Sequence, residues 1–179
     1  MSAGGTRRKT KARGRAPLRR LERFEGARRR LVLSSEAPAA TLAIGRLIGE
    51  LVPAGAVLSL EGGLGAGKTL IAKGICAGLG VSDEVLSPSF ILAEEYTGVV
   101  PVMHFDLYRL DGLDEIVRIG LFDAIDGRAV VLVEWGDRLP PGALDADVRI
   151  LMEFAGETSR RLTIEAPGEF LDEIERSTR

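Results

Sequence analysis

A glycine-rich segment that ends in lysine and threonine carries the clearest chemical signal in the sequence. Residues 62–69 read GGLGAGKT and match the pattern G-x-x-x-x-G-K-S/T. Glycines let backbone N–H groups approach phosphate oxygens, the Lys68 ammonium can reach the β- and γ-phosphates, and the Thr69 hydroxyl can ligate magnesium. The segment therefore predicts a loop that binds ATP with Mg²⁺. The expected nucleotide-binding residues are Gly62, Gly65, Ala66, Gly67, Lys68, Thr69 and Leu70.

Two acidic residues stand where apolar runs end, a position from which a side chain can reach such a loop. Glu134 follows the apolar residues 131–133, and Asp106 ends residues 102–106. An acid at the end of a buried strand usually completes the magnesium ligands of a P-loop protein, so Glu134 is a predicted metal ligand together with Thr69. Asp106 is predicted to hold a metal-bound water or to orient the attacking one. Simpler interpretations stay open, with Glu134 as an ordinary charge at a strand exit and Asp106 as a turn cap.

The loop needs a strand before it and a helix after it, and the hydrophobic pattern supplies both. Residues 56–60 are an apolar run of strand length, and residues 69–79 have apolar residues at helical spacing up to Gly80. Residues 129–133 are an unbroken apolar run, which is typical of a strand buried on both faces of an α/β sheet. The chain is therefore predicted to be a three-layer α/β, P-loop NTPase-like domain with a mixed, mainly parallel central sheet.

Weaker patterns predict the remaining elements. The further predicted strands are residues 30–33, an antiparallel hairpin of residues 90–96 and 99–106 joined tightly at Thr97-Gly98, and residues 148–154 and 161–164. The further predicted helices are residues 39–51, with Leu42, Leu47, Ile48 and Leu51 on one helical face, residues 113–125, and a turn after Pro167.

Composition restricts the class of protein. Hydrophobic residues make up 45% and charged residues 28% of the 179 residues, a balance typical of a globular protein. No apolar run approaches the roughly 20 residues that cross a bilayer, and no apolar stretch follows the basic N-terminus as in a signal peptide. We therefore expect a cytoplasmic protein without a membrane segment. The single cysteine, Cys76, cannot form an internal disulfide and is interpreted as a small buried side chain.

The charge is unevenly distributed along the chain. Residues 1–30 hold twelve Lys or Arg and two Glu, whereas the remainder is acidic and the formal net charge of the whole chain is -2. Few large apolar residues interrupt these charges, so residues 1–30 are predicted to be a disordered basic leader and residues 31–179 a single domain. The leader is interpreted either as a tether for RNA phosphates or as a solvated extension, such as one produced by a start site assigned too far upstream.

Four separated blocks resemble the bacterial TsaE family, ATPases of the tRNA threonylcarbamoyladenosine pathway. The blocks are residues 62–69 with Gly74 beyond them, SPSF at residues 87–90, HFDLYRL at residues 104–110, and VEW at residues 133–135. HFDLYRL is far more specific than a phosphate-binding loop. The resemblance implies a small P-loop ATPase, slow on its own, that acts with the proteins TsaB and TsaD. These attach threonylcarbamate to the adenosine beside the anticodon, so contact with tRNA would be indirect, through that complex.

The resemblance also implies residue roles by position. The implied catalytic residues are Lys68, Asp106 and Glu134, and the implied metal ligands are Thr69 and Glu134. Ser87 and Ser89 resemble a switch-like loop whose hydroxyls sense the γ-phosphate. The residue before Pro88 is biased toward extended geometry, which suits such a loop. Trp135 resembles an aromatic residue next to the nucleotide.

Two positions depart from the family pattern. Gly63 stands where the family usually has aspartate, and Ser89 stands where it usually has threonine. We expect nucleotide binding to survive both changes, whereas their effect on the rate of hydrolysis is open. The segments that would lie near the adenine are harder to align. The candidates there are Ser35, Glu36, Thr41, Ser159 and Arg160.

Other functions fit part of the pattern. A small-molecule kinase also combines a P-loop with strand-end acids, but the arginines of this chain are scattered rather than gathered as a lid over the phosphates. A GTP-dependent switch would carry an N-K-x-D-type guanine signature, which the sequence lacks. An ATP-gated adaptor, in which binding alone transmits the signal, stays open. His104 is interpreted as a strand histidine bonded locally rather than as a base or a ligand.

Overall fold

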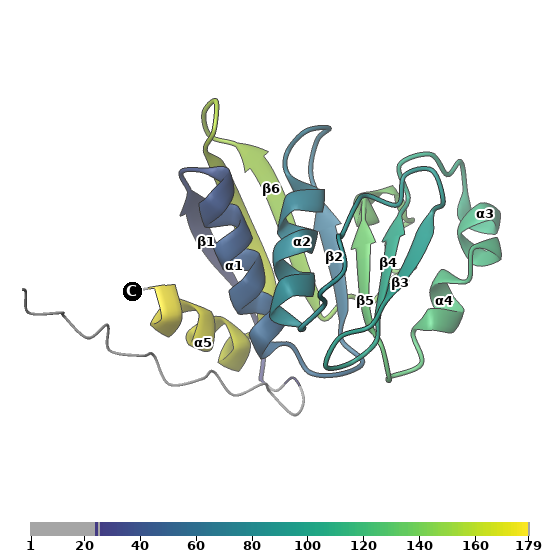
Figure 1. Ribbon diagram of the computed structural model, residues 1–179, viewed down its shortest axis with the longest axis horizontal. Helices are drawn as coiled ribbons and strands as arrows, with labels where there is room; N and C mark the ends of the chain where they lie inside the picture. The colour runs from purple at the N-terminus through teal and green to yellow at the C-terminus, as the bar shows by residue number, and fades with distance from the viewer. Residues whose placement is uncertain (1–23, 25, 179) are drawn as a thin grey trace, which may run out of the picture.

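The computed structural model describes residue 24 and residues 26–178. The seven strands form a single sheet, and helices pack against it (Figure 1). The strands are β1 (Arg28–Ser35), β2 (Val57–Glu61), β3 (Ala93–Tyr96), β4 (Val102–Asp106), β5 (Val130–Glu134), β6 (Val148–Phe154) and β7 (Arg160–Pro167). The helices are α1 (Pro38–Leu51), α2 (Lys68–Gly78), α3 (Leu113–Arg118), α4 (Leu121–Ala124) and α5 (Gly168–Thr178), with a 3-10 turn η1 (Gly136–Arg138). None of the helices in this described part has the length and apolar character that crossing a bilayer requires.

The strands form one mixed sheet in the order β1-β7-β6-β2-β5-β4-β3. The central pairs, β6 with β2, β2 with β5 and β5 with β4, are parallel, and the pairs toward both edges are antiparallel. Strands covered on both faces need apolar side chains in both directions, and β2 and β5 are accordingly buried along almost their whole length. The predicted α/β fold with a mixed sheet is confirmed, and its parallel pairing lies at the centre.

Helices cover both faces of the sheet, which gives the expected three layers (Figure 1). Helices α1, α2 and α5 pack on one face, against strand residues such as Leu58 and Leu132. Helices α3 and α4, with residues 139–146, cover the other face around Phe105 and Val131. The two apolar cores lie on opposite faces because successive side chains of a strand point in opposite directions.

Helix α1 packs backbone against backbone on α2, the helix that begins at the glycine-rich loop (residues 62–69). Each helix contributes two glycines spaced four residues apart, Gly45 and Gly49 from α1 and Gly74 and Gly78 from α2. A Cβ atom at Gly49 would lie 2.1 Å from the carbonyl oxygen of Ile75, closer than non-bonded atoms can approach. Larger side chains are therefore excluded from this contact, which holds α2 in place under the loop.

The structure corrects several predicted boundaries. Strand β1 is longer than residues 30–33 because β7 pairs with all of it, so residues 28–30 belong to the sheet and not to the basic leader. The predicted helix over residues 113–125 is broken at Gly120, whose φ of 78° is left-handed. Residues 90–92 lie outside β3, and five residues, 97–101, join the hairpin strands.

Two further predictions concern helices. Leu42, which was predicted to share one face of α1 with Leu47, Ile48 and Leu51, is 37% exposed. Ile44 is buried with the other three residues instead. The predicted turn after Pro167 is a helix of eleven residues, α5, whose apolar side packs against the core. Of the predicted basic leader, residues 1–23 and 25 lie outside the described residues.

Candidate active site

The glycine-rich loop joins the end of β2 to the start of α2, as predicted. Gly62, Gly65 and Gly67 have φ angles of 128°, 75° and 108°, in the region that side chains disfavour. A Cβ atom at Gly62 would also lie 2.3 Å from the carbonyl oxygen of Met152 in β6. The loop can adopt this path only with glycine at these positions. Its last residues form the N-terminus of α2, where backbone N–H groups favour an anion.

Lys68 folds back over the loop that precedes it. Its Nζ donates hydrogen bonds to the carbonyl oxygens of Gly62, at 2.7 Å, and Gly63, at 2.9 Å. The ammonium also lies 3.4 Å from the centre of the Trp135 ring, a cation–π contact. Burial lowers the pKa of Lys68, although the carboxylates of Glu134, Asp137 and Asp106 oppose that shift. The site thus holds a poorly solvated cation for which phosphate oxygens would be better partners than carbonyl groups.

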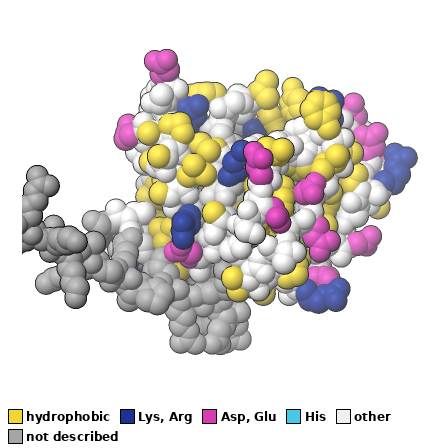
Figure 2. Space-filling model, in the orientation of Figure 1, with side chains coloured by type: hydrophobic (Ala, Val, Ile, Leu, Met, Phe, Trp, Pro, Cys, Tyr) yellow, Lys and Arg dark blue, Asp and Glu magenta, His cyan; other side chains and the backbone are white. Residues whose placement is uncertain are grey.

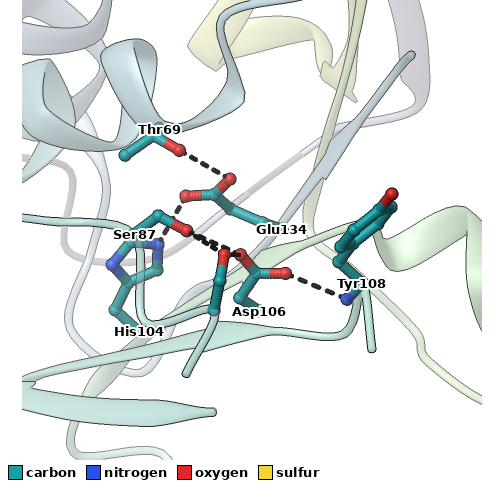
Figure 3. Close-up of polar contacts among 7 residues, drawn as sticks. Thr69, Ser87, His104, Asp106, Tyr108 and Glu134 are labelled. Carbon is teal, nitrogen blue, oxygen red and sulfur yellow. Dashed lines mark hydrogen bonds and ion pairs between the residues drawn. The ribbon is translucent and has the colours of Figure 1, made fainter. Parts of the chain in front are cut away.

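Glu134, the last residue of β5, lies opposite the first turn of α2. Alternation along the strand places it on the same face as Val130 and Leu132, toward α2. Its Oε2 accepts a hydrogen bond of 2.9 Å from Thr69 Oγ1, and its Oε1 lies 3.0 Å from His104 Nε2 (Figure 3). The side chain is almost completely buried. The strand therefore holds a fixed carboxylate against the threonine hydroxyl of the loop.

Asp106, the last residue of β4, is the direct neighbour of Glu134 in the parallel register. Its Oδ2 accepts hydrogen bonds from the hydroxyls of Ser87, at 2.6 Å, and Ser89, at 2.5 Å. Its Oδ1 accepts the backbone N–H of Tyr108 at 2.9 Å (Figure 3). A single buried carboxylate thus joins the SPSF loop to the end of β4, and the two predicted serines converge on the predicted aspartate.

Trp135 forms the side wall of this arrangement. It follows β5 in a left-handed backbone conformation, with φ of 61°, which is uncommon for a residue other than glycine. The turn aims its ring at the Lys68 ammonium, and the Tyr108 ring packs against it with centroids 4.9 Å apart. Strained backbone of this kind gathers at functional sites. Here it places an aromatic surface beside the loop.

These residues surround a cleft of about 560 Å³, within the range of small-molecule sites. Its lining includes the predicted residues Gly65, Gly67, Lys68, Thr69, Leu70, Ser87, Ser89, Asp106, Glu134 and Trp135. Gly62 and Ala66 do not line it and act through backbone oxygens, which accept from Lys68 and from Arg160. The lining residues that the motif assignments did not single out are Leu64, Lys73, Phe90, Tyr108 and Arg109. Lys73 could have been found one helical turn beyond Thr69, and the other four lie within the motif blocks, where no role had been assigned to them.

The candidates for contact with adenine do not line this cleft. Ser35 Oγ lies 2.7 Å from Thr41 Oγ1, and both side chains are buried at the start of α1. Arg160 instead contacts the outside of the glycine-rich loop, where its Nε donates to the Ala66 carbonyl oxygen at 3.0 Å. Its guanidinium also lies over the ring of Phe154. Arg160 therefore supports the loop from the β6–β7 side.

The chemistry of the site fits magnesium rather than a softer metal. Thr69 Oγ1 and Glu134 Oε2 are hard oxygen donors only 2.9 Å apart, and protein sites for Mg²⁺ use one or two carboxylates together with phosphate oxygens and water. Among the described residues, no cluster of three or more His, Cys, Asp or Glu side chains could hold a metal on protein ligands alone. The pair therefore suits an ion that arrives with a nucleotide.

A sheet with parallel central strands, a glycine-rich loop between β2 and α2, and two buried carboxylates at adjacent strand ends define a P-loop NTPase-like protein. A family model described as "Threonylcarbamoyl adenosine biosynthesis protein TsaE" matches residues 35–162. The chain belongs to the TsaE family, as its motifs indicated.

Individual relatives agree with this assignment. The protein named "tRNA threonylcarbamoyladenosine biosynthesis protein TsaE" in Bacillus subtilis (strain 168) is 39% identical over 132 residues, which cover 73% of this chain and 82% of the relative. The protein of the same name in Treponema pallidum (strain Nichols) is 35% identical over 120 residues, which cover 67% of this chain and 89% of the relative. The crystal structure of YdiB from Bacillus subtilis is similar with a TM-score of 0.65 and 33% identity, covering 87% of this chain and 100% of YdiB.

Proposed function

We propose that this chain is a magnesium-dependent ATPase of the cytoplasm that serves the threonylcarbamoylation of adenosine beside the anticodon of tRNA. One observation carries the ATPase proposal. The strand-end acids Glu134 and Asp106 hold the hydroxyls of Thr69, Ser87 and Ser89 at the mouth of the glycine-rich loop. The names of the relatives, which refer to tRNA threonylcarbamoyladenosine biosynthesis, support the pathway.

Triphosphate binding would use the backbone of the loop and Lys68. The buried ammonium would exchange the carbonyl oxygens of Gly62 and Gly63 for phosphate oxygens, because a charge-assisted bond is stronger than one to a neutral acceptor. Thr69 Oγ1 and Glu134 Oε2 would hold Mg²⁺, which when bound neutralises charge on the β- and γ-phosphates. Their present hydrogen bond keeps both oxygens at one place before a nucleotide arrives.

Hydrolysis requires an acceptor that orients the attacking water. The water oxygen would bond to the γ-phosphorus while the bond from that phosphorus to the β–γ bridging oxygen breaks, so that ADP leaves and the water proton ends on the released phosphate. Asp106 Oδ2 now accepts from Ser87 and Ser89, whose hydroxyls can rotate toward a γ-phosphate. Their rotation would leave Oδ2 free to accept a hydrogen bond from the water. The two serines would thereby connect occupancy of the γ-phosphate position to the readiness of Asp106.

The rim of the cleft supports a partner protein, which we propose to be the TsaB–TsaD complex, with tRNA contacted only through it. Phe90 is 82%, Leu64 72% and Ile91 61% exposed, and Phe90 and Leu64 line the cleft itself. Figure 2 shows hydrophobic side chains gathered along the upper edge of the molecule, above the sheet. Exposed apolar clusters of this kind mark interaction sites. A partner bound there would contact the residue next to Ser89.

Reconstitution of tRNA threonylcarbamoylation with TsaB, TsaD and ATP tests the proposal. Wild-type chain should support modification, and Glu134→Gln and Asp106→Asn should each lower hydrolysis and modification by about 100-fold or more, because each removes one charge at constant size. Glu153→Gln, an exposed acid on β6, is the matched control. ATP binding is followed by the fluorescence of Trp135, the single tryptophan.

The same variants separate hydrolysis from occupancy. A variant that binds ATP, does not hydrolyse it and still supports full modification would establish the ATP-gated adaptor instead. Modification that proceeds equally well without the chain would refute both roles.

A further inference from the structure

His104 is a buried residue of β4, two residues before Asp106 and on the same face of the strand. Its side chain has no exposed surface. In the register of the sheet it is paired with Leu132 of β5, two residues before Glu134. The imidazole therefore lies behind both acids of the proposed site, deeper in the protein than either, and outside the lining of the cleft.

The hydrogen bonds of His104 determine which ring nitrogen carries the proton. Nε2 lies 3.0 Å from Oε1 of Glu134. A carboxylate can only accept, so Nε2 is the donor in this hydrogen bond. Nδ1 is buried and is the one buried side-chain polar atom in the described part of the chain that lacks a hydrogen-bond partner. Of the two ring nitrogens, only Nε2 therefore has a hydrogen-bond partner.

An unpartnered buried nitrogen lowers stability compared with an apolar side chain of similar size. The ring of His104 lies near Tyr96, with centroids 6.4 Å apart, and in the sheet register His104 is flanked by Leu132 of β5 and Glu94 of β3. The side-chain hydrogen bond that the imidazole makes is the one to Glu134. We therefore interpret the loss of stability at Nδ1 as the consequence of keeping an imidazole whose Nε2 serves a function.

We propose that His104 is a positioning residue for magnesium: its Nε2–H fixes Oε1 of Glu134 so that Oε2 is presented, with Thr69 Oγ1, to the ion. This inference rests on the proposed function. The carboxylate is held from both sides, by His104 at Oε1 and by Thr69 at Oε2, and a metal ligated by Oε2 would replace only the second of these bonds. Outer partners of this type tune a ligand by orienting it.

Two substitutions of nearly equal size test the role. In His104→Gln the side-chain amide can reach the place of Nε2 and donate, whereas in His104→Asn the amide ends at the place of Nδ1 and cannot. Fluorescence of Trp135 reports ATP binding with Mg²⁺ and with EDTA. His104→Asn should weaken the Mg²⁺-dependent part of ATP affinity about tenfold or more, and His104→Gln should stay within about threefold of wild type. With EDTA all three proteins should bind alike.

Equal losses in both variants, or a loss that persists in EDTA, would show that His104 is merely structural. No loss in either variant would remove the inference while the proposed function stands. Absence of any Mg²⁺ effect in wild type would instead overturn the proposed function itself.

A measurement on the wild-type chain does not depend on a variant that folds. His104 is the single histidine of the sequence, so a long-range ¹H–¹⁵N spectrum contains one imidazole. We expect a protonated Nε2 in the nucleotide-free protein, and its resonance should shift when ADP with Mg²⁺ is added but much less with ADP and EDTA. An unprotonated Nε2, or identical shifts in both additions, would overturn the assignment.

Discussion

Lys68 shows how the site is prepared at the scale of a single residue. Its ammonium is enclosed between two loop carbonyls and the Trp135 ring and is nearly inaccessible to water. Such burial disfavours the charged form, which is why the pKa of Lys68 is lowered. A fold that keeps a poorly solvated cation gives up stability, and this is a known consequence of building a binding site.

The lowered pKa of Lys68 predicts a pH-dependent stability. At pH values between the folded-state pKa and the ordinary value of 10.5, the unfolded chain binds more protons than the folded one. The free energy of unfolding therefore increases as the pH rises through this window. Below that window the cost of the buried charge is fully present. The stability of Lys68→Met relative to wild type should therefore be greatest near pH 7 and should decrease as the pH approaches 10.5.

Urea unfolding of nucleotide-free protein at several pH values measures this difference. Lys73→Met is the control, since Lys73 is a half-buried lysine on the same helix. A constant difference between wild type and Lys68→Met across the range would contradict the prediction.

At the scale of single residues, the sequence predicted which side chains belong to the site but not which side chains they contact. Thr69 and Glu134 were predictable because a loop motif and an apolar run are local patterns. The contact of Trp135 with Lys68 depends on a left-handed turn at a residue other than glycine, which no local propensity favours. The bond from His104 to Glu134 depends on the order of strands, which makes β4 and β5 neighbours.

At the scale of elements, adjacent glycines of the loop have different roles. Gly62 combines φ of 128° with a Cβ position 2.3 Å from a carbonyl oxygen, whereas a Cβ at Gly63 would meet nothing within 4 Å. Gly62→Ala should lower the free energy of unfolding by about 2–4 kcal/mol and abolish ATP binding. Gly63→Ala and Gly63→Asp should each stay within about 1 kcal/mol of wild type. Thermal and urea unfolding measure the contrast, and equal effects of Ala at both positions would contradict it.

The contact between α1 and α2 predicts an unusual sign for a glycine-to-alanine change in a helix. Alanine is favoured over glycine inside a helix by about 1 kcal/mol, but at Gly49 the new methyl group would meet the Ile75 carbonyl oxygen 2.1 Å away. Overpacking of this kind costs roughly 1–3 kcal/mol, so Gly49→Ala should lower the melting temperature. Ala43→Gly, on the exposed side of α1, isolates the propensity. A more stable Gly49→Ala protein would show that α1 can move away from α2.

Some helices and strands could be predicted from local sequence patterns, whereas others depend on contacts between distant parts of the chain. The strands on either side of the loop and residues 130–134 were predictable because continuous apolar runs are local signals. The close approach of α1 to α2 was not, since glycines in a helix read locally as weak points rather than as contacts. The full length of β1 was not either, because Arg30 is held by Glu165 of β7, and that pairing is tertiary.

At the scale of the whole molecule, the first strand of the described part of the chain packs against its last strand and last helix. Strand β1 pairs along its length with β7, so Arg28 lies opposite Pro167, and α5 packs beside both (Figure 1). Arg29 forms an ion pair of 2.8 Å with Asp172 of α5. The order of elements along the sequence predicted the central fold, but it contained no signal for contacts between segments so far apart.

Phe24 tests where the folded domain begins. Its ring packs edge-to-face on Phe170, with centroids 5.4 Å apart, and it contacts the core although it lies within the predicted leader. Phe24→Ala should lower the free energy of unfolding by about 1–2 kcal/mol, since half-buried aromatic area and one aromatic pair are lost. Phe90→Ala, which removes a ring that is 82% exposed, should change it by less than about 0.5 kcal/mol. Urea unfolding of both variants at one pH gives the comparison. Equal stabilities would place Phe24 outside the cooperative unit, with the domain beginning at β1; a loss confined to Phe24→Ala would extend that unit to residue 24.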